Sequence, residues 1–141
     1  MSSGSPRSEY TLRRRVHFYE TDTAGIVHFS NYFRYMEEAE HALWREVGLT
    51  IAKRSGVGFP RIAASFEYHR PLRVEDEFDV RIRIVAMNEK TIRYECVLLK
   101  GDEKIATGSL TIICVRAVDG QAMKSVPIPP EIADRFEIAS E

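Results

Sequence analysis

The sequence has little cysteine and no cluster of residues at the spacing of zinc ligands. Its 141 residues include two cysteines, Cys96 and Cys114, and both lie inside apolar, strand-like stretches. Two cysteines cannot form a disulfide framework, and a metal site would need further ligands close to them. We therefore expect two buried thiols that behave as small apolar side chains. That use of cysteine is typical of the reducing cytoplasm, where we expect the protein to reside.

The sequence also lacks an excess of basic charge and a long apolar run. There are 20 Lys and Arg residues against 21 Asp and Glu, a net charge of −1, so we expect no nucleic-acid partner. No apolar run approaches the roughly 20 residues of a membrane-spanning helix, so we expect no membrane association. Residues 1–9 are rich in Ser, Gly and Pro and are predicted to be a disordered tail rather than a secretion signal. Residues 10–141 fit a single domain.

The spacing of apolar residues predicts one long helix. Ser30 and Asn31 favour a helix N-cap, and Gly48 stands where a helix commonly stops. The acidic residues between them, Glu40 among them, are expected to lie mostly off the apolar stripe. The stripe itself comprises Tyr32, Met36, Ala39, Leu43 and Val47, at spacings of four and three residues.

The rest of the chain predicts strands. Apolar and polar residues alternate over 10–19, 59–69, 77–87 and 92–98, and residues 104–116 form a long, largely apolar stretch. Short connections make the last three of these strands antiparallel neighbours. The sequence therefore predicts an α+β domain, with one helix laid across a curved antiparallel sheet of about five strands. The strand at 104–116 is apolar or small on both faces and one helix cannot cover both, so we expect a homo-oligomer. We assign Arg13, Arg14 and Arg15 to a solvated strand face.

Asp22 stands in a Thr/Ala/Gly loop between a strand and the start of the predicted helix. A helix N-terminus presents free N–H groups that can polarise a carbonyl oxygen, and a nearby carboxylate can attack that carbon or activate water. Alternatively, Asp22 is a turn residue whose side chain accepts a hydrogen bond from the backbone two residues on. Local sequence leaves both interpretations open.

Two blocks of sequence resemble hotdog-fold acyl-CoA thioesterases. Residues 18–32, FYETDTAGIVHFSNY, resemble the opening motif of the 4-hydroxybenzoyl-CoA thioesterase type and its short-chain bacterial relatives. The second block is Tyr68-His69-Arg70-Pro71 followed by Asp76-Glu77-Phe78. The similarity covers about residues 10–130 and includes the closing Pro127-Ile128-Pro129.

The resemblance implies a hotdog fold, dimers that pair edge to edge and often pair again into tetramers, and no cofactor or metal. It implies that Asp22 is the catalytic carboxylate, acting as nucleophile or general base. The candidate substrate-binding residues are Gly25, where the substrate approaches the backbone, Val27, His28, Phe29, whose backbone N–H would hold the thioester oxygen, and Tyr32. In the short-chain relatives the His falls one residue later than His28, where this chain has Phe29.

Several alternatives stay open at this point. The first is a non-catalytic acyl-CoA sensor, which would not require the Asp22-x-x-Gly25 loop. A hotdog dehydratase is less favoured, because no Asp/His pair has suitable spacing. The acyl group is aromatic or short and aliphatic. Bases on alternating strands are candidates for the CoA phosphates or are ordinary surface charge; they are Arg81, Arg83, Arg93, Lys100 and Lys104.

Overall fold

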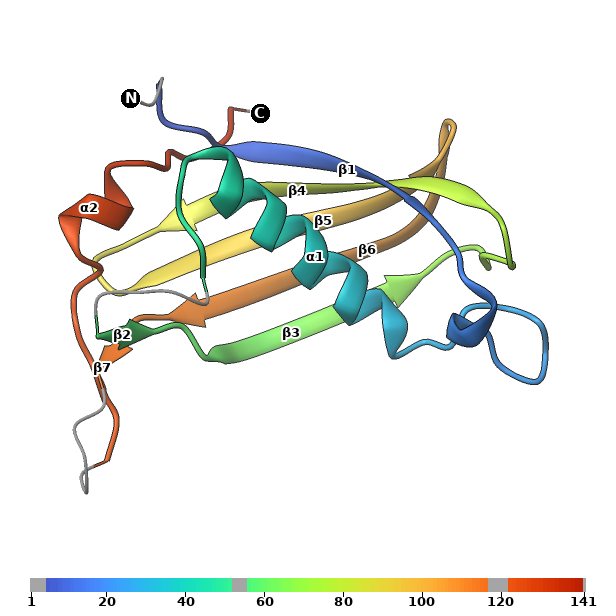
Figure 1. The fold of residues 1–141 in the computed structure, drawn as a ribbon, viewed down its shortest axis with the longest axis horizontal. Helices are drawn as coiled ribbons and strands as arrows, with labels where there is room; N and C mark the ends of the chain where they lie inside the picture. Colours follow the sequence, from blue (N-terminus) through green and yellow to red (C-terminus); the bar gives the residue numbers. More distant parts are fainter. Residues whose placement is uncertain (1–4, 52–55, 117–121, 141) are drawn as a thin grey trace.

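A curved antiparallel sheet crossed on one face by a long helix forms most of the molecule (Figure 1). The computed structural model describes residues 5–51, 56–116 and 122–140. Within these residues the elements, in chain order, are β1 (Glu9–Arg15), a 3-10 turn η1 (Phe18–Glu20), α1 (Asn31–Glu46), β2 (Val57–Gly58), β3 (Arg61–Tyr68), β4 (Glu77–Met87), β5 (Thr91–Lys100), β6 (Glu103–Ile113), β7 (Val115–Arg116), β8 (Lys124–Ser125) and α2 (Pro130–Ala133).

The large sheet confirms the predicted five strands. Their order is β1-β4-β5-β6-β3, and every neighbouring pair is antiparallel, including the predicted β4-β5-β6 series. The short strands β2, β7 and β8 form a second sheet, which the alternation of residues did not predict. Strands of two residues carry too little pattern to be recognised from sequence.

Helix α1 begins and ends where the sequence predicts. Gly48 follows it with a φ of +84°, and its N–H donates to the carbonyl of Arg45 at 3.0 Å. The N–H of Leu49 donates to the carbonyl of Trp44 at 2.9 Å, which completes a Schellman motif. Ser30 occupies the N-cap position, but it has helical backbone angles and its hydroxyl makes no capping bond.

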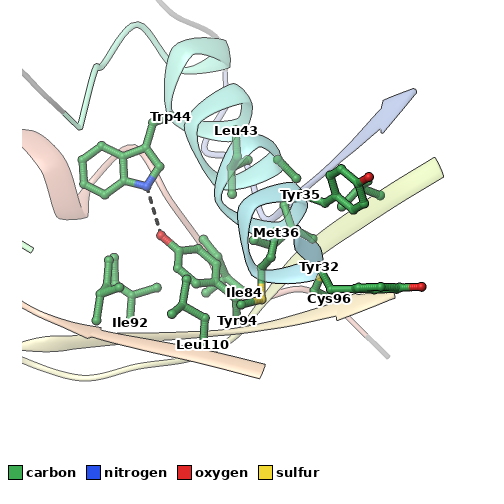
Figure 2. Packing of buried hydrophobic residues seen from close by; sticks show 14 of the residues in the cluster. Tyr32, Tyr35, Met36, Leu43, Trp44, Ile84, Ile92, Tyr94, Cys96 and Leu110 are labelled. Carbon is green, nitrogen blue, oxygen red and sulfur yellow. Dashed lines mark hydrogen bonds between the residues drawn. The ribbon is translucent and has the colours of Figure 1, made fainter. Parts of the chain in front are cut away.

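The core lies between α1 and the sheet (Figure 2). Trp44 and Tyr94 are almost fully buried, and the indole N–H of Trp44 donates to the Tyr94 hydroxyl oxygen at 3.0 Å. Both cysteines are free and buried, as predicted. The predicted helical stripe is buried along its whole length: Tyr32, Met36, Ala39, Leu43 and Val47.

The prediction for Glu40 is wrong, because this side chain is fully buried. Its carboxylate accepts hydrogen bonds from Arg61 of β3, at 2.6 Å from Nη2 and 3.3 Å from Nη1. Tyr94 adds a side-chain hydrogen bond. Burial raises the pKa of Glu40, and the interactions with Arg61 and Tyr94 oppose that shift. The helical period predicts that Glu40 faces solvent. Instead, its carboxylate forms an ion pair with Arg61, which belongs to a different element.

Two strand predictions are corrected at their ends. The strand predicted over 10–19 stops at Arg15, and Phe18 lies in η1 with 80% of its surface exposed. Strand β3 lies within the predicted range 59–69 but begins at Arg61, and its Ile62 is 57% exposed. Strand β3 is an edge strand, and its pairing with β6 shifts register between Arg61 and Ala63, which disrupts the alternation.

The face of the sheet opposite α1 is only partly covered. Thr107, Ser109 and Thr111 of β6 are partly exposed on that face. Regular alternation along β6 would place Ile105 on this face too, but Ile105 is 1% exposed. The β5–β6 register shifts at Leu98 and Leu99, so Ile105 lies in a bulge and turns inward.

The part of the predicted tail that the structure describes contacts the domain. The Arg7 N–H donates to the carbonyl of Arg135, Ser8 accepts a backbone hydrogen bond from Ile84, and Glu9 begins β1. Residues 1–4 lie outside the described residues. Among the described helices, none is long and apolar enough to cross a membrane.

Candidate active site

A cavity of about 480 Å³ brings the two sequence motifs together at the N-terminal end of α1. The Asp22 loop and the Tyr68–Pro71 segment lie about 50 residues apart in sequence, yet both line this cavity. The predicted residues Asp22, Val27, Phe29 and Tyr32 line it, whereas Gly25 and His28 do not. The complete lining is Asp22, Ile26, Val27, Phe29, Tyr32, Tyr68, His69, Arg70 and Pro71.

The Asp22 loop is a short hairpin that fixes one oxygen of its carboxylate. The Asp22 N–H donates to the Ile26 carbonyl at 2.8 Å, and Asp22 Oδ1 accepts the Ala24 N–H at 2.8 Å. Gly25 closes the turn with a φ of +82°, which only glycine adopts without strain. The turn interpretation of Asp22 is therefore realised. Across the described chain, Oδ2 accepts no hydrogen bond, so this oxygen remains free beside the cavity.

An unpaired backbone N–H lies at the start of α1. The Asn31 N–H donates to the His28 carbonyl at 2.9 Å, and the Tyr32 N–H donates to the Phe29 carbonyl at 3.4 Å. The Phe29 N–H donates to no acceptor in the part of the chain that the structure describes. A free amide at a helix start can polarise a carbonyl oxygen, so the arrangement is chemically suited to an oxyanion.

Aromatic residues form part of the cavity lining. The Tyr32 and Tyr68 rings pack edge to face with centroids 4.8 Å apart, and the Tyr68 hydroxyl donates to the Phe29 carbonyl at 3.0 Å. Burial, with a smaller contribution from Tyr68, raises the pKa of Tyr32 to about 12. The Tyr32 hydroxyl is therefore uncharged near pH 7.

A β-bulge positions the second motif. The inward-turned Ile105 presents its carbonyl oxygen to two amides, the N–H of His69 at 2.8 Å and that of Arg70 at 3.1 Å. These bonds hold the Tyr68–Pro71 segment where it leaves β3. The sequence signals this segment through the Tyr-x-x-Pro pattern, although its residues were not among the predicted site residues.

His28 turns away from the cavity. Its Nδ1 lies 2.8 Å from the Ser30 hydroxyl oxygen and accepts the Ser30 N–H at 3.2 Å. The ring stacks on Phe29 with centroids 4.6 Å apart. Phe29, the next residue, lines the cavity, which matches the position of the His in the short-chain relatives.

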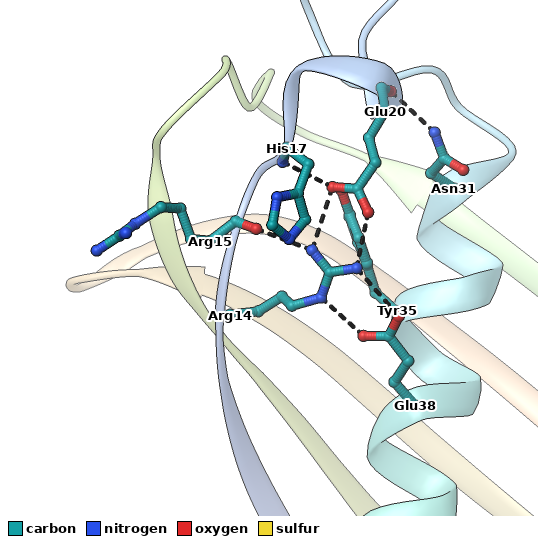
Figure 3. Close-up of polar contacts among 7 residues, drawn as sticks. All are labelled: Arg14, Arg15, His17, Glu20, Asn31, Tyr35 and Glu38. Atoms are coloured by element: carbon teal, nitrogen blue, oxygen red, sulfur yellow. Dashed lines mark hydrogen bonds and ion pairs between the residues drawn. The ribbon is translucent and has the colours of Figure 1, made fainter.

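Sequence reasoning missed a buried ion pair behind the loop (Figure 3). Glu20 is 6% exposed, and both of its oxygens accept hydrogen bonds from Arg14, at 2.7 and 3.1 Å. The assignment of Arg14 to a solvated face is therefore wrong, since its side chain is 16% exposed, whereas Arg13 and Arg15 are exposed as predicted. Burial raises the pKa of Glu20, but hydrogen bonds from Arg14, the His17 N–H and Tyr35 outweigh it, so the pKa lies below its usual value. The sequence did contain a signal for the burial of Arg14, because Arg14 alternates in register with the apolar residues of its strand.

The basic residues proposed for phosphates lie away from the cavity. None of them lines it, and Arg70 is the basic residue that does. Arg93 and Lys104 line a separate hollow of about 590 Å³ on β3, β5 and β6. Arg83 pairs with Glu9, and Lys100 pairs with Asp76.

Comparison with known proteins gives consistent results. The thioesterase-like superfamily matches residues 16–136. A putative esterase of Aquifex aeolicus is 35% identical over 127 residues, covering 89% of this chain and 95% of the relative. A 1,4-dihydroxy-2-naphthoyl-CoA hydrolase of Synechococcus elongatus is 23% identical over 138 residues, covering 95% and 99%. The solved structure of a gentisyl-coenzyme A thioesterase has a TM-score of 0.78 and 28% identity, covering 88% and 99%. The predicted hotdog fold is confirmed.

Proposed function

Since the chain belongs to the thioesterase-like superfamily, we propose that this thioester hydrolase cleaves an acyl-CoA substrate in the cavity beside Asp22. The observation that carries the proposal is the free Oδ2 of Asp22 in the same cavity as an unpaired helix-start amide at Phe29. The products are a carboxylic acid and free CoA. Two buried free thiols agree with a reducing compartment, such as the cytoplasm.

The Phe29 N–H supports the reaction by binding the thioester oxygen. As negative charge develops on that oxygen, a preorganised amide stabilises it without having to reorient. The N-terminal end of α1 adds a partial positive charge in the same direction. Gly25 and Val27 shape the loop around the approaching substrate, and His28 supports Phe29 from behind by stacking.

Asp22 acts in one of two ways. As a nucleophile, Oδ2 attacks the thioester carbon, the CoA thiolate leaves, and water hydrolyses the resulting mixed anhydride. As a general base, Oδ2 takes a proton from a water molecule that attacks the carbon. A single turnover in heavy-oxygen water tests the nucleophilic route. Label in the enzyme's carboxylate supports an anhydride that water opens at the Asp22 carbonyl, because the general-base route labels only the acid product.

The cavity favours an aromatic acyl group over a short aliphatic one. Phe29, Tyr32 and Tyr68 offer ring faces and edges rather than a narrow aliphatic slot, and aromatic pairs gain energy beyond their buried area. The relatives named for a gentisyl and a dihydroxynaphthoyl thioester act on aromatic acyl groups. Arg70, whose contact with Glu103 at 3.6 Å is exposed, is the nearest candidate for a CoA phosphate.

The active unit is a homodimer that pairs again into a tetramer. Strand β3 is an edge of the large sheet, and its Ile62 is exposed. An exposed edge strand is a template for pairing with another chain. Light scattering coupled to size-exclusion chromatography measures the assembly, and a monomer would contradict it.

Asp22→Asn tests the proposed function. Because the amide can neither attack nor take a proton effectively, we expect turnover of an aryl-CoA to fall at least about 10²-fold. Thiol release from benzoyl, hydroxybenzoyl and short aliphatic thioesters measures it. Asp102→Asn, the same change in the exposed turn between β5 and β6, is the matched control and should retain turnover. Near-normal turnover by Asp22→Asn would contradict the assignment.

A non-catalytic acyl-CoA sensor is the second candidate function. The cavity beside Asp22 would serve a sensor as well as an enzyme. Binding of the thioesters by calorimetry, with no thiol release from any of them, would favour the sensor.

A further inference from the structure

Glu20 lies at the base of the Asp22 loop and bonds to the segments on either side of it. The loop is a hairpin in which Thr21 bridges Val27 and the Glu20 carbonyl accepts the His28 N–H at 2.9 Å. The same carbonyl accepts the side-chain amide of Asn31 at 2.8 Å. The backbone of Glu20 therefore joins both arms of the loop and the first turn of α1.

The Glu20 side chain fixes that base to two other elements. Arg14 of β1 binds both carboxylate oxygens, and the Tyr35 hydroxyl of α1 donates to Oε1 at 2.9 Å. The His17 N–H donates to the same oxygen at 2.9 Å. These four bonds come from the strand before the loop, the turn and the helix after it (Figure 3).

Arg14 is itself held on three sides. Its guanidinium donates to Glu38 at 2.7 Å and to the Arg15 carbonyl at 2.8 Å, and it lies over the Tyr35 ring at 4.8 Å. A bidentate pair with this support has one geometry, because the planar guanidinium cannot rotate without breaking several bonds. Because the Arg14 guanidinium is held in place by these contacts, it fixes the position of the Glu20 carboxylate.

We propose that the Glu20–Arg14 ion pair is a positioning device, which holds Asp22 and the Phe29 amide at the separation that thioester cleavage requires. Asp22 lies on the first arm of the hairpin, and Phe29 follows His28 on the second, so the base of the hairpin decides their spacing. Glu20 does not touch the cavity, and its oxygens are occupied by Arg14, His17 and Tyr35. It is therefore a positioning residue rather than a catalytic residue. The inference rests on the proposed function.

Glu20→Gln tests the proposal through the reaction. The amide keeps the size and one acceptor oxygen, but it cannot accept both guanidinium bonds. We expect kcat to fall about 10-fold or more with KM little changed, since misplacing a reacting group by about 1 Å can cost about 10²-fold. Glu77→Gln, which removes the exposed ion pairs with Arg13 and Arg15, is the control and should retain kcat.

Hydrogen exchange tests the same proposal without activity. In Glu20→Gln, the amides of residues 20–31 should exchange at least about 10-fold faster, while those of β4 and β5 exchange as in the parent protein. Unchanged exchange in the loop, or unchanged kcat despite faster exchange, would overturn the proposal. Faster exchange throughout the chain would also overturn it, because that result indicates a general loss of stability.

The two proposals fail in distinguishable ways. If the unmodified protein releases thiol from none of the thioesters, the proposed function is wrong, and the exchange measurement alone decides whether Glu20 holds the loop. If the unmodified protein is active and Glu20→Gln retains kcat, only the positioning role is wrong. Arg14→Gln combined with Glu20→Gln should lower kcat by no more than the more severe of the two single substitutions, because the two residues act as one unit.

Discussion

Replacing Arg61 with methionine leaves the carboxylate of Glu40 buried without its cation. Glu40 is fully buried, and Arg61 supplies two of its hydrogen bonds. Breaking a buried ion pair by removing one partner typically costs about 3–5 kcal/mol. The Arg61 side chain is 28% exposed, so water partly screens the ion pair and we expect a cost at the lower end of that range. We expect Arg61→Met to lower the free energy of unfolding by about 3 kcal/mol at pH 7.

The cost depends on pH with a definite sign. Burial raises the pKa of Glu40, and Arg61→Met removes the group that opposes this shift. The folded state then holds a proton more tightly than the unfolded state, whose pKa is about 4.3. Stability therefore falls as pH rises from that value through the raised pKa. We expect the penalty to shrink as pH is lowered from neutrality toward the pKa of the unfolded state.

Urea unfolding of Arg61→Met and Glu40→Gln/Arg61→Met between pH 4.5 and 7.5 measures these effects. The double variant keeps an acceptor for the Tyr94 hydroxyl and carries no buried charge. It should lie within about 1 kcal/mol of the parent protein and show no added pH dependence. A penalty for Arg61→Met that is below about 0.5 kcal/mol at pH 7, or that does not change with pH, would refute the reasoning.

Two further predictions concern packing in the sheet and core. A Cβ at Gly108 would lie 2.7 Å from Cε1 of Phe66, so Gly108→Ala should lower the free energy of unfolding by about 1–3 kcal/mol, and Gly108→Ala/Phe66→Leu should recover part of it. Equal urea midpoints for Gly108→Ala and the parent would contradict this. Burial raises the pKa of Cys96 to about 12, so neither cysteine should react with a thiol reagent until urea unfolds the protein. Rapid labelling of the native protein would show that the thiols are accessible.

The long helix could be predicted because its information is local. Apolar spacing from Tyr32 to Val47 and a glycine at position 48 depend on neighbours within a few residues, and the structure has the helix at Asn31–Glu46. The same holds for β4 and β5, whose alternation is regular. Where a bulge intervenes, as at Ile105, alternation assigns the wrong face, because the extra residue depends on pairing with a distant strand.

The buried ion pairs could not be predicted in the same way. Glu40 and Arg14 are charged residues whose ordinary place is at the surface, and only their partners Arg61 and Glu20 make burial tolerable. Those partners lie on other elements, so a local pattern contains no trace of the pairing. The orientation of His28 is a similar case, since its bonds to Ser30 rather than its residue type turn it from the cavity.

The sequence by itself determined the class of fold, the long helix, the five strands of the large sheet and the identity of the loop that carries Asp22. Each of these depends on short-range periodicity or on a contiguous motif. The tertiary structure decided that the Asp22 loop and the Tyr68–Pro71 segment share one cavity, and that Glu20 and Arg14 lie behind them. These relations arise because the sheet order β1-β4-β5-β6-β3 brings distant segments to one end of α1, and strand order depends on contacts between residues far apart in the chain.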